Sequence, residues 1–108
     1  MPLDENRLLL EFEKLLRETN REHINGAIRR LGIDDLRPLA DLIARVRTAY
    51  LKYIFELSHE VEAPNLPTQD QLAKLSELRN MFSELLGASQ AFEVAIKRGY
   101  LDCSSTRG

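Results

Sequence analysis

Two stripes of apolar residues, each repeating at alternating spacings of three and four, constrain the fold of this chain more than any other feature. The first lies within about residues 35–61 and consists of Leu36, Leu39, Ile43, Val46, Tyr50, Tyr53 and Leu57. The second lies within about residues 69–98 and consists of Leu75, Leu78, Phe82, Leu85, Ser89, Phe92 and Ile96. Because this spacing places every member of a stripe on one face of an α-helix, both segments are predicted to be long helices.

The N-terminal segment carries a third apolar helical face. Its members include Leu8, Leu9, Phe12, Leu15 and Leu16. The tetrapeptide that begins at Thr19 and ends at Glu22 has the form of a capping box, which favours a helix break near residue 19. The apolar pattern also continues to Leu31, just before Gly32, which favours one helix running to that point. Both alternatives are left open by the sequence.

The predicted fold is an all-α, antiparallel bundle of three to four helices. The stretch VEAPNLPT is the clearest loop in the chain, and a short loop between two long helices favours antiparallel neighbours. Gly99, after two cations, is expected to end the last helix, and residues 102–108 are expected to form a frayed tail. At 108 residues the whole chain, 1–108, fits one domain.

Composition narrows the class of function and the expected location. The net charge is −2, from 15 basic and 17 acidic residues, whereas proteins that bind DNA through bulk charge are usually basic. The only cysteine, Cys103, has no internal disulfide partner, so we expect a reducing, cytoplasmic location. No apolar run approaches the length of a membrane span, and the acidic start of the chain is unlike a signal peptide.

The segment YLKYIFEL, Tyr50 to Leu57, is apolar beyond its stripe. Leu51, Ile54 and Phe55 are further apolar residues outside the stripe, with Tyr50 beside them. They make the apolar surface of this helix wider than one neighbouring helix can cover. This additional apolar surface is covered either by the N-terminal segment of the same chain or by a second chain. We expect a non-enzymatic protein–protein interaction module without a cofactor, which forms a homodimer or binds another helical protein through these residues.

A nucleic-acid-binding regulator is the first alternative. Residues 21–55 carry seven basic against four acidic groups, and the candidate contacts are Arg29, Arg30, Arg37, Arg45 and Arg47. The order of elements from residue 27 to residue 42 is similar to a helix-turn-helix. However, Pro38 would fall inside the recognition helix, and Asp34 and Asp35 would meet phosphates. Nucleic acid is therefore not the favoured partner.

A metal-binding or phosphotransfer bundle is the second alternative. Glu56 and His59 form one Glu-x-x-His element, whereas a di-metal helical bundle needs two such elements and two further glutamates. His23 is the candidate for phosphotransfer, but the segment after it lacks the lysine expected there. The sequence leaves open whether His23 or His59 has a role.

Overall fold

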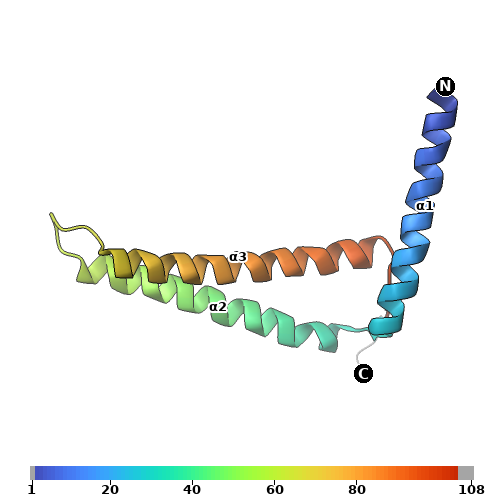
Figure 1. Cartoon of the computed structure of the whole chain (residues 1–108). Coiled ribbons are helices and arrows are strands. Elements are labelled where there is room, and N and C mark those ends of the chain that lie inside the picture. Colours follow the sequence, from blue (N-terminus) through green and yellow to red (C-terminus); the bar gives the residue numbers. More distant parts are fainter. Residues whose placement is uncertain (1, 105–108) are drawn as a thin grey trace. The chain divides into compact units, whose positions relative to one another are not determined.

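The computed structural model describes residues 2–104, and these residues are mostly helical (Figure 1). The elements in chain order are α1 (Pro2–Ala27), β1 (Arg30–Leu31), α2 (Ile33–Glu60), α3 (Gln69–Lys97) and β2 (Asp102–Cys103). The all-α class is therefore confirmed, while the bundle arrangement stays a prediction. None of the described helices has the length and apolar character needed to cross a membrane.

The chain forms two compact units. The terminal unit consists of Met1–Leu36 and Ala91–Gly108, and the middle unit consists of Arg37–Gln90. Each unit has its own set of contacts and is described separately below. The assignment of residues 1–108 to a single domain stays a prediction.

In the terminal unit, α1 is a continuous helix from Pro2 to Ala27. Both sequence alternatives for its end are wrong, because the helix neither breaks near Thr19 nor reaches Leu31. Thr19 lies in the helix interior, where a capping side chain has no free N–H groups to satisfy. The helix ends just after Asn25 and Gly26, two weak helix formers.

Two short strands join the ends of the terminal unit. β1 pairs with β2 in parallel, with Arg30 opposite Asp102 and Leu31 opposite Cys103. The Ser104 N–H extends the pairing by donating to the Leu31 carbonyl at 2.8 Å. Asp102 to Ser104 thus take part in main-chain pairing with β1, and residues 105–108, where the rest of the predicted frayed tail falls, lie outside the described residues.

The core of the terminal unit sits beside these strands. Leu31 is 5% exposed and Leu101 is 3% exposed. The two leucines lie on or next to the paired strands, so strand pairing and burial of these side chains occur together. Burial of side chains of this size stabilises the folded state by about 1.5–3 kcal/mol each.

In the middle unit, the predicted stripes are the covered faces of α2 and α3. Every stripe residue in this unit is half-buried or buried, and Leu57 is the most buried of them. The Tyr50 and Phe82 rings lie 6.2 Å apart between centroids, and the Tyr53 hydroxyl donates to the Gln71 carbonyl at 3.3 Å. The alternating spacing therefore identified correctly which side of each helix is covered.

The boundaries of α3 follow local capping chemistry. At its start the Thr68 N–H donates to the Gln71 side chain at 2.8 Å, and the Gln71 N–H donates to the Thr68 hydroxyl at 3.1 Å, which is a capping box. At its end Gly99 has a φ of 68°, and the Tyr100 N–H donates to the Ala95 carbonyl at 3.0 Å. This is a Schellman ending, and it confirms Gly99 as the predicted cap.

Replacing Gly99 with alanine is expected to lower the free energy of unfolding by about 1–2 kcal/mol, because an L side chain disfavours this backbone conformation. A Cβ atom at this position would meet nothing within 4 Å, so the cost is conformational and not steric. Chemical denaturation followed by circular dichroism measures it.

Gly87→Ala is the matched control, since Gly87 lies inside α3 with equally open space around it. There the same substitution should raise the free energy of unfolding, by up to about 1 kcal/mol. Shifts of the same sign for both variants would contradict the role assigned to Gly99.

Candidate functional site

An apolar surface lies on α2 in the middle unit. We define the α2 patch as Leu51, Ile54 and Phe55, whose side chains are 58%, 38% and 64% exposed. Tyr50, which the sequence grouped with them, is half-buried against Phe82 and borders the patch. An exposed cluster of large apolar side chains is typical of a protein interaction surface.

Helical spacing and local contacts position the α2 patch. Leu51 and Phe55 are one helical turn apart, so their side chains lie above one another. The Phe55 and His59 rings lie 4.4 Å apart between centroids, and His59 Nδ1 is 2.8 Å from the Phe55 carbonyl oxygen. Lys52 and Glu56 form an ion pair at 3.9 Å on the same helix. The surface is therefore apolar, with a charged pair and an aromatic histidine contact nearby.

The candidate nucleic-acid contacts are partly used inside the chain. In the middle unit, Arg45 Nε lies 2.9 Å from the Asp41 carboxylate, and the Arg47 guanidinium lies 5.0 Å from the centre of the Phe82 ring. Arg37 is exposed in the same unit, and Arg29 and Arg30 are exposed in the terminal unit. Arg45 thus already has an acidic neighbour, and Arg47 an aromatic one.

The candidate metal ligands have other neighbours as well. Glu56 pairs with Lys52, and His59 contacts the Phe55 carbonyl. Within the part of the chain that the structure describes, no group of three or more His, Cys, Asp or Glu side chains is placed to hold a metal ion. Glu56 and His59 therefore lack, among the described residues, the further ligands that a di-metal site requires.

A polar cluster in the terminal unit ties α1 to the end of the chain. We call Arg21, Asn25, Gly99 and Asp102 the clasp. Arg21 donates to the Asp102 carboxylate and to the Gly99 carbonyl, the latter at 2.9 Å. The Asn25 side chain donates to Asp102 Oδ2 at 3.2 Å and accepts from the Asp102 N–H at 3.1 Å. No pattern in the sequence indicates these contacts, which join residues about eighty positions apart.

The clasp makes stability depend on pH. The hydrogen bond from Arg21, and then the one from Asn25, lowers the pKa of Asp102. The folded-state pKa is thus below the unfolded value of about 3.9, so the contribution to stability is complete above that value and is lost as pH falls through the folded pKa. We expect Asp102→Asn to be less stable than wild type at about pH 7, with the difference shrinking towards about pH 2.

Urea unfolding of both proteins at the two pH values measures this difference. Asp41→Asn serves as the control, because Asp41 makes an exposed pair within one helix. A difference between wild type and Asp102→Asn that does not change with pH would contradict the charge-based role of Asp102.

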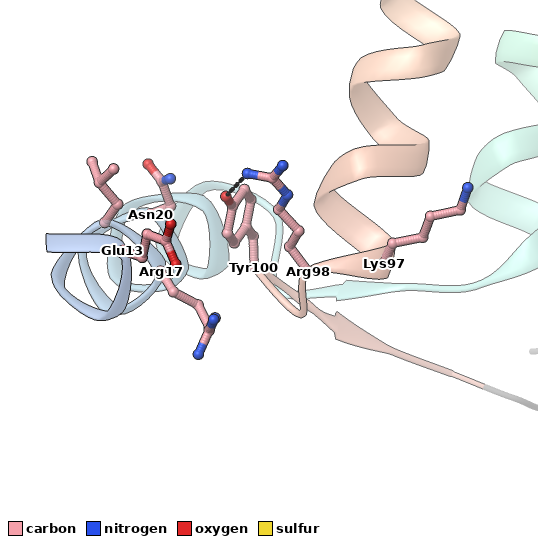
Figure 2. Close-up of a pocket in the computed structure, with 7 residues that line it drawn as sticks. Glu13, Arg17, Asn20, Lys97, Arg98 and Tyr100 are labelled. Atoms are coloured by element: carbon pink, nitrogen blue, oxygen red, sulfur yellow. Dashed lines mark hydrogen bonds between the residues drawn. The ribbon is translucent and has the colours of Figure 1, made fainter. Parts of the chain in front are cut away.

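A hollow of about 640 Å³ lies beside Tyr100 in the terminal unit (Figure 2). We call it the Tyr100 hollow. Its lining residues are Glu13, Leu16, Arg17, Asn20, Lys97, Arg98 and Tyr100. Sequence reasoning missed it, because its two sides come from α1 and from the turn after α3. The one available signal was the Gly99 cap, after which the chain turns and carries Tyr100 back.

Comparison with known proteins assigns no family to this chain: no family model matches it, and no curated protein or solved structure is significantly similar to it.

Proposed function

We propose that this protein is a small, non-enzymatic helical interaction module whose α2 patch binds a second copy of the chain. The observation that supports this most is the exposure of Leu51 and Phe55, each more than half exposed on a helix whose stripe already packs within the middle unit. Apolar side chains of this size, one turn apart, make a surface that association would remove from water.

A two-fold dimer buries the α2 patch of both copies in one contact. Each copy contributes the same surface, so Leu51 and Phe55 are buried twice. Burying a fully exposed side chain of this size stabilises by about 1.5–3 kcal/mol; because Leu51 and Phe55 are 58% and 64% exposed, burying four of them gains roughly 4–7 kcal/mol. Association itself costs about 4–15 kcal/mol, so a stable dimer also requires burial of Ile54 and of neighbouring half-exposed residues.

The charges beside the patch favour a second copy over an unrelated partner. Lys52 and Glu56 are one turn apart and of opposite sign. When two copies of α2 cross antiparallel around a two-fold axis near Ile54, Lys52 of one copy approaches Glu56 of the other. The surface is thus self-complementary in charge as well as apolar, which suits a symmetric contact.

In this proposal the middle units of two copies pack against each other through α2, which differs from the single-chain bundle of three to four helices that the sequence predicts. The contacts of Tyr50 with Phe82 and of Tyr53 with Gln71 run in opposite sequence order along α2 and α3, which supports antiparallel packing of these helices. The exposed free thiol of Cys103 is consistent with a reducing, cytoplasmic location.

The molar mass in solution tests the proposal. Sedimentation equilibrium over a range of concentrations should show a species of twice the 12.4 kDa chain mass. A protein that stays at the chain mass at every concentration would contradict self-association. The patch would then be covered by the N-terminal segment of the same chain or by a different protein.

A further inference from the structure

We propose that the Tyr100 hollow binds a small molecule that carries a phosphate group. The hollow lies wholly within the terminal unit, so this site is independent of the α2 patch and of dimer formation. It is a half-open hollow at which charged side chains and a hydrogen-bonding cluster coincide.

The two sides of the hollow are held in place by the clasp. Arg17 and Asn20 come from α1, whereas Lys97, Arg98 and Tyr100 come from the end of α3 and the turn that follows. Arg21, one turn beyond Arg17, bonds the Gly99 carbonyl and the Asp102 carboxylate, which flank Tyr100 in sequence. The hollow is therefore bounded by two segments that are joined by hydrogen bonds. These bonds hold its two sides together before a ligand binds, as in most small-molecule sites.

The charge of the lining favours a dianion. Arg17, Lys97 and Arg98 are cations and Glu13 is the single carboxylate, which leaves a surplus of two positive charges. A phosphate monoester carries about 1.5–2 negative charges near neutral pH. Guanidinium groups bind phosphate oxygens through paired, charge-assisted hydrogen bonds.

The Tyr100 hydroxyl lies next to cationic side chains of the hollow. Arg98 Nη1 donates to the Tyr100 hydroxyl at 3.5 Å, as the dashed line in Figure 2 shows. The hydrogen bond from Arg98, together with Asn20 and Arg17, lowers the pKa of Tyr100, so these groups favour negative charge at this position. Because a 3.5 Å bond is long and weak, the Arg98 guanidinium is free to turn towards a stronger acceptor.

The reach of the rim cations suits a ligand that enters from solvent. In Figure 2 the side chains of Arg17 and Lys97 point away from the Tyr100 ring, whereas Asn20 and Arg98 lie near it. Long cationic side chains at a rim can fold over a bound anion, as flexible stems with terminal charge allow.

The size of the hollow favours a phosphorylated organic molecule over a free ion. A volume of about 640 Å³ falls within the range of about 300–1,000 Å³ that is typical of small-molecule sites. Leu16 and the Tyr100 ring provide apolar contact beside the cations. The phosphate is expected to contact the arginines, and the organic part is expected to lie against Leu16 and Tyr100.

Isothermal titration of the full chain with inorganic phosphate and with phenyl phosphate, each against chloride at equal ionic strength, tests the site. Phenyl phosphate should bind more tightly than inorganic phosphate. Arg17→Ala and Arg98→Ala should each weaken binding by about tenfold or more, since each removes charged hydrogen-bond donors. Glu13→Gln should tighten binding, because it removes the one opposing charge.

Arg7→Ala is the control, because Arg7 lies on α1 outside the hollow and neighbours Glu11. It should bind phenyl phosphate like wild type. The proposal is overturned by equal heats with phosphate and chloride, by phenyl phosphate binding no more tightly than inorganic phosphate, or by an equal loss in Arg7→Ala and Arg98→Ala. If an alanine variant loses helix by circular dichroism, Glu13→Gln decides, and unchanged or weaker binding there counts against the site.

Discussion

Replacing both Leu51 and Phe55 with glutamate is expected to convert a dimer into a folded monomer. The molar mass should fall from twice 12.4 kDa to 12.4 kDa. A two-fold contact would lose four buried apolar side chains and gain four charges at its centre, so Kd should rise by at least about 10³-fold. Both side chains are more than half exposed in the single chain, so the fold should tolerate the change.

Leu66→Glu is the matched control for this experiment. Leu66 is also an exposed leucine of the middle unit, but it lies in the loop between α2 and α3. Its substitution should leave the molar mass unchanged while adding the same charge. Wild type and the double variant sedimenting alike, with helical content retained, would remove the dimer proposal, and dissociation by Leu66→Glu as well would place the contact elsewhere.

Leu101→Ala is expected to have the largest effect on stability. Leu101 is 3% exposed, the most buried apolar side chain in the described part of the chain. Truncation of a buried leucine to alanine lowers the free energy of unfolding by about 2–5 kcal/mol. This is a large share of the roughly 5–15 kcal/mol that stabilises a domain. The effect should be centred on the terminal unit, since Leu101 and Leu31 are the buried side chains among the residues of that unit that the structure describes.

Leu9→Ala separates burial from residue type. Leu9 belongs to the same unit but is 58% exposed, so the same truncation should change the free energy of unfolding by less than about 0.5 kcal/mol. Urea denaturation followed by circular dichroism compares the two variants. Equal destabilisation would mean that Leu9 is covered in solution, whereas no destabilisation by Leu101→Ala would mean that the strand pair contributes little to folding.

The helices of the middle unit could be predicted from sequence because their signals are local. The stripes through Leu57 and Phe82 repeat over several turns, so the same helical spacing is observed several times in each segment. The Thr68 capping box and the Gly99 ending each depend on residues within one turn. The exposed α2 patch followed from the same periodicity, because Leu51 and Phe55 fall off the stripe.

The terminal unit could not be predicted in the same way. β1 and β2 have two residues each, too few to show an alternating pattern. The bond from Arg21 to Asp102 joins positions 81 residues apart, and nothing near either residue indicates the other. The Thr19 motif misled because a capping box means a helix start only where the preceding residues are not helical, and here α1 continues through it.

Because of where their residues lie in the chain, the two units are completed at different stages of synthesis. Every residue of the middle unit has been joined by position 90, whereas the terminal unit includes residues 91–108. Leu31 cannot pair with Cys103, and Arg21 cannot bond to Asp102, until those late residues have been made. α1 is thus translated first among the helices, but Gly99 and Asp102, which hydrogen-bond to its Arg21, are made among the last residues, so these contacts of α1 form only late in synthesis.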